Sequence, residues 1–308
     1  MLDPMDRENL LEALRPEAGQ AFDLAVGTSF SVDLEALMFA PLAFALFDVE
    51  GPPDPTALLA AIQQNAARLA LYCDRAQVRP PAAGQKLFAL LEPTLLPVRA
   101  PRGGAFHPKL WVLRYRDAGG GRRHRVLVLS RNLTHDTSWD LAVRFDEDEE
   151  GAPLGRDVAA ALTALDELRP SPLARELAGS IARARFALPR PFEEARLRLL
   201  GGRAEGGAAD PLAEVRGERL LVVSPFLAAG RLEELRARAS RDGRLVSRPS
   251  ELERMGGRAL EGWRTPLVLH EAADPQADAG GGEAALRGLH AKLVAVDRGE
   301  RTTWFVGS

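Results

Sequence analysis

The feature that most constrains this 308-residue chain is a short pattern, present twice, in which a lysine follows a histidine by two residues. The chain has three lysines against thirty-seven arginines (40 Lys plus Arg in all), and two of the three lie in His107-Pro108-Lys109 and His290-Ala291-Lys292. Chance produces two such coincidences in roughly one of a thousand random sequences. Because arginine stands at almost every other basic position, these two sites indicate a need for a compact ammonium group.

Each His-x-Lys pair is followed by a predicted β-hairpin. In the first, β-rich segments at 109–115 and 125–129 flank Gly119-Gly120-Gly121, and in the second, segments at 292–296 and 303–306 flank a polar turn. On an extended strand, residues two apart point to the same face, so each pair presents a titratable nitrogen and a positive charge to one ligand. Phosphate is the ligand that this combination favours. The hairpins end in Ser130-Arg131-Asn132 and in Gly307-Ser308, which completes an internal repeat.

These residues resemble the signature of the phospholipase D superfamily, which is H-x-K, an Asp five residues on, and then G-S-x-N, present twice per active site. The second copy matches at His290, Lys292, Asp297, Gly307 and Ser308, and the first at His107, Lys109, Ser130 and Asn132. The first copy has Arg114 in place of the Asp and Leu129 in place of the Gly. Two further segments fit loosely: Gly27-Thr28-Ser29-Phe30, and Leu221 to Phe226.

Within that superfamily the resemblance is strongest to the tyrosyl-DNA phosphodiesterase and nuclease branches. There too the first copy lacks the Asp, and the Asn is followed by a leucine and, a few residues on, a Trp, as in Leu133 and Trp139. The resemblance implies an α/β fold of two similar lobes, residues 1–190 and 191–308, each a mixed β-sheet flanked by helices. It places the active site at the interface of the lobes, complete in one chain without an obligate dimer.

The resemblance also implies roles for individual residues. His107 attacks phosphorus to give a phosphohistidine, and His290 protonates the leaving oxygen and then activates water; family precedent alone decides which histidine is the nucleophile. Lys109, Lys292 and Asn132 complete the catalytic set. Ser130 and Ser308 bind the substrate phosphate, and Asp297 supports the site without touching substrate. Because the lysines carry the positive charge, neither a metal nor a cofactor is expected.

Three functions remain open at this point. The first is a nuclease or DNA-end-processing phosphodiesterase, with a bacterial defence system and its partner proteins as one setting. It is favoured by nine Lys/Arg residues and a single acid between Arg99 and Arg131. The second is a phospholipid phosphodiesterase or transferase, for which no apolar interfacial surface is evident. The third is a non-catalytic phosphate-binding subunit, which the missing Asp of the first copy allows.

Composition sets broader limits. With 46% hydrophobic residues, the chain can bury one large core or two medium ones. Its longest nearly apolar stretch, Ala36 to Phe47, contains Pro41 and is too short to span a bilayer. The N-terminus lacks the pattern of a secretory signal, and a lone cysteine, Cys73, excludes an intrachain disulfide, so a cytoplasmic location is expected. No Cys or His spacing is typical of a metal site.

Hydrophobic patterning predicts alternating strands and helices. Beyond the two hairpins, strands are expected at 25–30, 69–73, 141–145, 220–224 and 267–270, and helices at 34–46, 55–68, 158–168, 173–185 and 231–240. The acidic run 146–150 is interpreted as an exposed turn, and 274–282 as a surface loop. The boundary between the two repeats is expected at Pro189-Arg190-Pro191 and the Gly-rich segment 201–207. Surface or supporting roles are expected for His124, His135 and His270, and a buried apolar role for Cys73.

The end of the sequence carries one more expectation. In the family pattern an Asn follows the Ser by two residues, as Asn132 follows Ser130, and the sequence stops at Ser308, before that Asn would occur. We therefore expect these residues to be the front part of a longer protein, with the second motif cut short.

Overall fold

The computed structural model describes residues 9–45, 54–81, 86–100, 103–135, 138–200, 210–213, 215–270 and 288–307. Ser308 and the segments predicted as a linker at 201–207 and a loop at 274–282 lie outside these residues. The chain divides into two compact units. The first comprises Met1–Val128, Asn132–His135 and Ala142–Ala208, and the second comprises Leu129–Arg131, Asp136–Leu141 and Ala209–Ser308.

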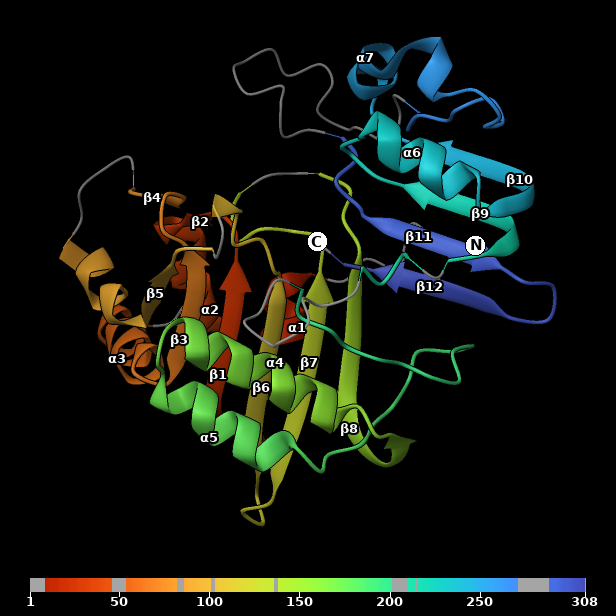
Figure 1. Ribbon diagram of the computed structural model, residues 1–308. Helices are drawn as coiled ribbons and strands as arrows, with labels where there is room; N and C mark the ends of the chain where they lie inside the picture. Colours follow the sequence, from red (N-terminus) through yellow and green to blue (C-terminus); the bar gives the residue numbers. More distant parts are fainter. Residues whose placement is uncertain are drawn as a thin grey trace. The chain divides into compact units, whose positions relative to one another are not determined.

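The first unit is built on a six-stranded sheet (Figure 1). Its order is β5 (Leu95–Val98), β3 (Leu69–Asp74), β1 (Gln20–Ser29), β6 (Leu110–Asp117), β7 (Arg122–Leu129) and β8 (Ala142–Ala152). β1 pairs in parallel with β3, and β3 with β5, whereas β1 pairs antiparallel with β6, and β6 with β7. The sheet is therefore mixed, and β1 lies at the change from parallel to antiparallel pairing.

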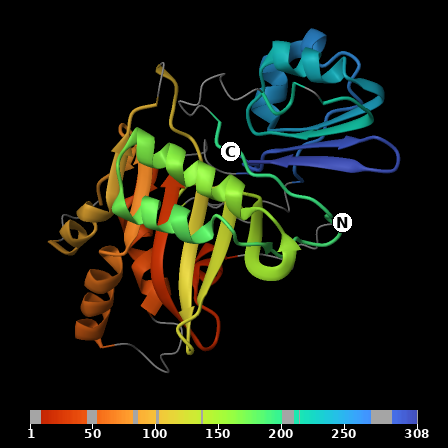
Figure 2. The ribbon, with the colours of Figure 1, turned by 60° about the horizontal axis from the view of Figure 1, so that its bottom comes forward.

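Helices cover both faces of this sheet. α4 (Gly155–Leu168) and α5 (Pro172–Ile181) lie across one face, as Figures 1 and 2 show, and their fully buried Leu162 and Leu177 join Val112 of β6 in one core. On the other face, Phe44 of α2 (Leu34–Ala45) stacks on Phe22 of β1. The remaining elements are α1 (Leu10–Leu14), α3 (Pro55–Ala66), the short pair β2 (Val32–Asp33) and β4 (Val78–Arg79), and the 3-10 turns η1 (Lys86–Leu90) and η2 (Glu92–Thr94).

The second unit contains a four-stranded sheet in the order β10 (Ala239–Val246), β9 (Gly217–Val223), β11 (Leu293–Asp297) and β12 (Thr302–Val306). Leu220 and Val222 of β9 are buried against its helices, α6 (Ala229–Arg236) and α7 (Pro249–Ala259), whereas the alternate residues Leu221 and Val223 are half-buried. This alternation is the one expected of a strand with a single apolar face.

The two sheets share one pattern of pairing. In the first unit β3 runs parallel to β1, which is followed across the sheet by the antiparallel strands β6 and β7. In the second unit β10 runs parallel to β9, which is followed by the antiparallel strands β11 and β12. Both predicted hairpins are thus confirmed, as is the α/β class with mixed sheets. Each His-x-Lys pair lies directly before the first hairpin strand and not within it, because β6 begins at Leu110 and β11 at Leu293.

Two predicted elements are wrong, and a third is shorter than predicted. Leu267, in the run expected to be a strand, makes only an isolated bridge to Val246, and Leu267 and Val268 are exposed. The helix expected at 231–240 ends at Arg236, and β10 begins at Ala239 because this segment pairs with β9. The acidic run 146–150 lies inside β8. Of the described residues, none belongs to a helix long and apolar enough to cross a membrane.

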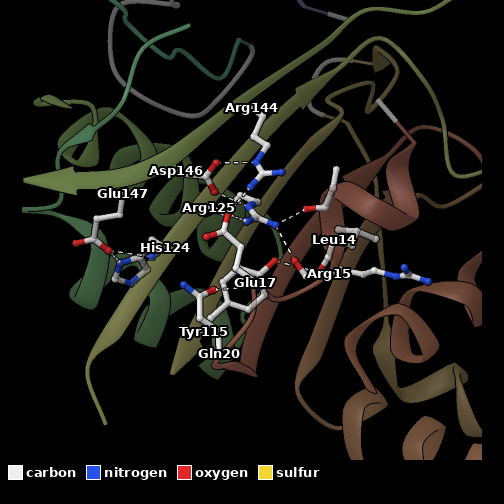
Figure 3. Close-up of polar contacts among 11 residues, drawn as sticks. Leu14, Arg15, Glu17, Gln20, Tyr115, His124, Arg125, Arg144, Asp146 and Glu147 are labelled. Atoms are coloured by element: carbon white, nitrogen blue, oxygen red, sulfur yellow. Dashed lines mark hydrogen bonds and ion pairs between the residues drawn. The ribbon is translucent and has the colours of Figure 1, made fainter. Parts of the chain in front are cut away.

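The buried Arg125 ties the arginine-rich β6–β7 hairpin to neighbouring segments. Arg125 is fully buried and donates to the carbonyls of Ala13 and Arg15 at 2.9 and 2.8 Å, while Asp146 of β8 and Glu17 bind its remaining nitrogens (Figure 3). The carboxylates explain the strand at 146–150, because Asp146 points to Arg125 and Arg144, and Glu147 to His124. The acidic and basic runs therefore neutralise each other across neighbouring strands.

Candidate active site

The first His-x-Lys pair is positioned by four consecutive residues at the end of β1. Gly27 packs so closely on Trp111 and Leu71 that an added Cβ would come within 3.1 Å of both. Thr28 Oγ1 accepts a hydrogen bond from the backbone N–H of Leu110 at 2.7 Å, which fixes the residue after Lys109. Ser29 Oγ accepts one from Leu133 N at 3.0 Å, which fixes the residue after Asn132.

The fourth residue of this series, Phe30, packs against His107 with ring centroids 4.9 Å apart. Lys109 is only 2% exposed, and its Nζ lies 3.0 Å from Nδ1 of His107 and 3.2 Å from the His107 carbonyl oxygen. The predicted same-side presentation of the pair is therefore observed, with the ammonium directly beside the imidazole. The segment 27–30, a loose sequence match, proves to be the anchor for both His107–Lys109 and the strand end that carries Asn132.

Within the part of the chain that the structure describes, the side-chain oxygen of Asn132 lacks a hydrogen-bond partner, whereas the side chain of Arg114 forms ion pairs. Among the described residues, Asn132 Oδ1 is one of few buried side-chain oxygens with no hydrogen-bond partner. Arg114, which stands where the family pattern has Asp, is 1% exposed and binds Asp23 and Glu176, with Ser180 Oγ 3.3 Å away. Arg114 therefore belongs to the packing between β1, β6 and α5.

These ion pairs also change the interpretation of the basic segment between Arg99 and Arg131. Of its nine cations, Arg114 and Arg125 are buried in ion pairs, and Arg116 pairs with Asp23. Burial opposes ionisation of Asp23, but hydrogen bonds from Arg116 and Arg114 prevail and lower its pKa. His124, for which a surface or supporting role was expected, is 4% exposed and bridges Glu147 at 2.7 Å and Ser180 at 3.0 Å. Much of this positive charge is therefore structural.

The second His-x-Lys pair contains a histidine–carboxylate contact. His290 is 6% exposed, and its Nδ1 lies 2.9 Å from Oδ1 of Asp140. Ser130 Oγ donates to the same oxygen at 2.7 Å and accepts from the backbone N–H of Leu141 at 2.8 Å. The carboxylate therefore orients the ring and leaves Nε2 as the nitrogen on the side of Lys292, whose Nζ is 3.5 Å away.

Backbone pairing brings Asp140 to His290. Trp139 forms a parallel bridge with Leu289, its N–H donates to Gly288 O at 2.8 Å, and its carbonyl accepts from His290 N and Ala291 N at 2.8 and 2.9 Å. Ser130 was predicted to bind phosphate beside the first pair. The structure instead buries it completely and directs its hydroxyl to Asp140.

Lys292 is held much as Lys109 is, with Nζ 3.2 Å from the carbonyl oxygen of its own histidine. Gly307 N donates to Lys292 O at 3.4 Å, so the Gly of the motif lies beside the lysine. Burial lowers the pKa of Lys292 to about 8; the Asp140 carboxylate opposes this shift and Arg248 adds to it. The ring of the exposed Phe226 lies under both cations, 5.9 Å from Lys292 Nζ and 5.4 Å from Arg248 Cζ.

Asp297 lies away from Lys292. It lies at the opposite end of β11, where it binds Arg219 at 2.7 Å and accepts from Gly299 N at 2.8 Å. The hydrogen bonds from Gly299 and Arg219 lower its pKa. Asp297 therefore shapes the β11–β12 turn, and the supporting role that the resemblance implied for it stays a prediction. Ser308, the other predicted phosphate contact of this copy, lies outside the described residues.

The sequence analysis did not identify Asp140 as a residue of the site, and it gave Phe30 and Phe226 no role of their own. Asp140 follows the Asn-Leu-Trp context by one residue, but its partner is 150 residues away in the chain, so no local pattern reveals the pairing. Phe30 and Phe226 each follow the central strand of a sheet and each contact the motif histidine of that sheet. The described residues contain no group of three or more His, Cys, Asp and Glu side chains that could hold a metal ion.

Comparison with known proteins yields similarity of fold alone. No family model matches the sequence, and no curated protein matches it. A structure of yeast tyrosyl-DNA phosphodiesterase aligns over 77% of this chain and 60% of its own length, with 12% identity and a TM-score of 0.41. A histidine-to-alanine variant of that enzyme aligns over 92% of this chain and 74% of its own, with 10% identity and a TM-score of 0.49. This similarity assigns no residue of the site.

Proposed function

We propose that this protein is a phosphodiesterase of the phospholipase D type that cleaves its substrate through a phosphohistidine, and that its substrate is nucleic acid. The observation that carries the proposal is the pair of His-x-Lys sites. In each, a lysine Nζ lies 3.2 Å from the carbonyl oxygen of its own histidine and faces the imidazole, directly before a hairpin. Two such sites provide two positive charges and two proton-transfer groups, which hydrolysis of a phosphodiester requires.

The surroundings of the two histidines support different roles. The ammonium of Lys109 lies 3.0 Å from Nδ1 and 3.3 Å from Nε2 of His107, and two positive charges this close would repel each other. A neutral imidazole is the form that attacks phosphorus. The Asp140 carboxylate lies 2.9 Å from Nδ1 of His290 and orients the ring so that Nε2 is free to give a proton on the side of Lys292. We therefore propose His107 as the nucleophile and His290 as the general acid.

The chemistry balances in two steps. A ring nitrogen of His107 forms a bond to phosphorus while the bond from phosphorus to the leaving oxygen breaks, and Nε2–H of His290 protonates that oxygen. In the second step, His290 takes a proton from water, the water oxygen attacks phosphorus, and the nitrogen–phosphorus bond breaks. Lys109 and Lys292 neutralise the non-bridging oxygens throughout. The products are an alcohol and a phosphate monoester, and both histidines are restored.

The test is to trap the intermediate on a short 3′-labelled single-stranded oligonucleotide and to identify the modified residue by mass spectrometry under alkaline conditions, where phosphohistidine persists. We expect the label on His107 in wild type, no label in His107→Ala, and label that accumulates in His290→Ala. Turnover in both variants should fall by about 10³-fold or more. Because lysines supply the charge, wild-type turnover should survive excess EDTA.

Each contrary outcome has a definite meaning. Label on His290 would exchange the two roles. Tight binding of oligonucleotide without cleavage or label would indicate a phosphate-binding subunit. Cleavage of phosphatidylcholine vesicles without cleavage of oligonucleotide would indicate a lipid phosphodiesterase. Activity lost in EDTA and restored by Mg²⁺ would contradict the mechanism.

A further inference from the structure

Phe226 is exposed although the residues on both sides of it are buried. Pro225 and Leu227 pack into the second unit, whereas the Phe226 side chain is 58% exposed. Exposing an aromatic ring of this size forgoes the stabilisation that burial would give. Because its two neighbours are buried, the ring is a single projecting group within this loop.

The loop is held in place by hydrogen bonds at successive residues. Ser224 Oγ donates to Phe226 O at 2.7 Å, and Ser247 Oγ donates to Ser224 O at 2.7 Å. Leu227 N donates to Glu251 at 2.9 Å, and its carbonyl accepts from Arg254 at 2.7 Å. An exposed ring on a backbone fixed in this way is preorganised, so a ligand that stacks on it need not order the loop.

The surroundings of the ring indicate what that ligand is. Arg248 and Lys292 approach the ring at 5.4 and 5.9 Å, and the His290 ring stands edge-on to it at 6.4 Å. A phosphate bound by the Lys292 ammonium at about 2.8 Å therefore lies within one nucleotide of a planar apolar surface. Nucleic acid is a polymer that places a flat ring system at a regular distance from each phosphate, and unstacked bases bind aromatic side chains in this way.

We propose that Phe226 is a stacking platform for one nucleobase of single-stranded nucleic acid, adjacent to the phosphate that Lys292 binds. This inference rests on the proposed function and specifies its substrate. In a duplex the bases are stacked on one another, so the ring is available only to a strand with an unpaired base at this position. Stacking is tolerant of base identity, so the site selects for an unpaired strand and not for a sequence.

The experiment measures binding of a short fluorescent oligothymidylate, and of an abasic strand of the same length, to the whole protein. Wild type should bind the oligothymidylate at least about tenfold more tightly, a difference of about 1.4 kcal/mol. Phe226→Leu should lose most of that preference and still bind the abasic strand normally, which shows that its phosphate site is intact. Phe226→Trp should keep the preference. The matched control is Phe192→Leu, an exposed phenylalanine of the first unit (39% exposed), which should behave as wild type.

The inference is overturned if Phe226→Leu keeps the preference, if it weakens both strands equally, or if wild type shows no preference. It is also overturned if the substitution abolishes binding to phosphatidylglycerol vesicles and leaves oligothymidylate binding intact. If Phe226→Leu folds poorly, the inference is tested on wild type with a series of oligothymidylates that each lack one base. The inference requires that loss of the base at one position lowers the affinity about tenfold. Binding is measured separately from turnover. A strand that binds through its base but is not cleaved would therefore contradict the phosphodiesterase proposal and leave the stacking inference standing.

Discussion

The two His-x-Lys copies share a backbone design and differ in what surrounds the histidine. Both lie before the antiparallel strand next to a central strand, and both lysines lie 3.2 Å from the carbonyl oxygen of their own histidine. In the first copy the imidazole contacts an ammonium at 3.0 Å, and in the second it contacts a carboxylate at 2.9 Å. A duplicated motif can thus supply two chemically distinct histidines, because the difference lies in one neighbouring side chain and not in the motif.

The copies also differ at the position five residues after the lysine, and this difference leads to the largest expected effect. Arg114 is buried between Asp23 and Glu176. In Arg114→Met, the largely buried Asp23 loses a buried cation, so we expect the free energy of unfolding to fall by about 3–5 kcal/mol. Urea denaturation measures this change.

The matched control is Arg116→Ala, because Arg116 binds the same carboxylate from the surface, with 56% of its side chain exposed. We expect a much smaller shift of the denaturation midpoint for Arg116→Ala. Equal midpoints for the two variants would show that Arg114 is not the structural member of this pair, and its place in the motif would need a functional explanation.

The second expected effect concerns the carboxylate that distinguishes the copies. Asp140→Asn keeps the size of the side chain but removes its charge and allows an amide N–H to face His290 Nδ1. The ring would then lose the acceptor that fixes its tautomer and orientation, so we expect kcat to fall by about 10²-fold.

The chain provides a control for Asp140→Asn in the first unit. Glu147→Gln makes the same chemical change at a second histidine–carboxylate pair, in which Glu147 lies 2.7 Å from His124. Burial raises the pKa of Glu147, but the hydrogen bonds with His124 outweigh burial, and the pKa is lowered. The Glu147→Gln variant should be less stable, with kcat near the wild-type value. A similar loss of kcat in both variants would indicate that Asp140 acts through stability, and the two copies would no longer differ in mechanism.

Much of the fold could be predicted from the sequence because the evidence for it was local. The hairpins, the central strands and α4 follow from turn glycines, β-branched runs and helical periodicity within single segments. β10 could not be predicted from the sequence, because Ala239–Val246 is rich in polar residues and becomes a strand only by pairing with β9. The acidic strand β8 likewise depends on arginines of β7, which are visible only once the sheet is assembled.

The candidate site was predictable to a similar extent. His107, Lys109, His290 and Lys292 were singled out because their spacing repeats, and in the structure each lysine contacts its histidine. Ser130 was assigned to phosphate because the motif places it there, but its hydroxyl binds Asp140, a residue that no spacing rule includes. Residues that act through a partner distant in the chain are the ones that sequence patterns miss.

A third, smaller effect concerns the pH dependence of Lys292. Burial lowers the pKa of Lys292 to about 8, so in the folded protein its charge is present below that pH and is lost as the pH rises through it. We expect oligonucleotide affinity to fall by roughly tenfold between about pH 7 and pH 9.5, as one charged hydrogen bond to phosphate is lost. Lys292→Arg, whose charge does not titrate in this range, should remove the fall.

The same shift affects stability with a definite sign. The unfolded chain keeps the Lys292 proton up to the ordinary pKa of 10.5, whereas the folded chain releases it near 8. Between these values the unfolded state binds more protons, so the contribution of Lys292 to the free energy of unfolding rises with pH. Affinity and stability should therefore change in opposite directions over this range, and a parallel decline of both would mean that alkaline unfolding causes the loss of binding.

The smallest expected effect is at Asp297, the position in the second copy that corresponds to Arg114. Its hydrogen bonds to Arg219 and Gly299 lie at the turn end of β11, and Lys292 lies before the other end. Five residues of extended strand separate the two side chains by roughly 16 Å, at about 3.3 Å per residue. Asp297→Asn should therefore leave kcat, and the pH at which affinity falls, at their wild-type values. If either changed several-fold, Asp297 would support Lys292 as the motif implies, and the two copies would be more alike in function than their contacts indicate.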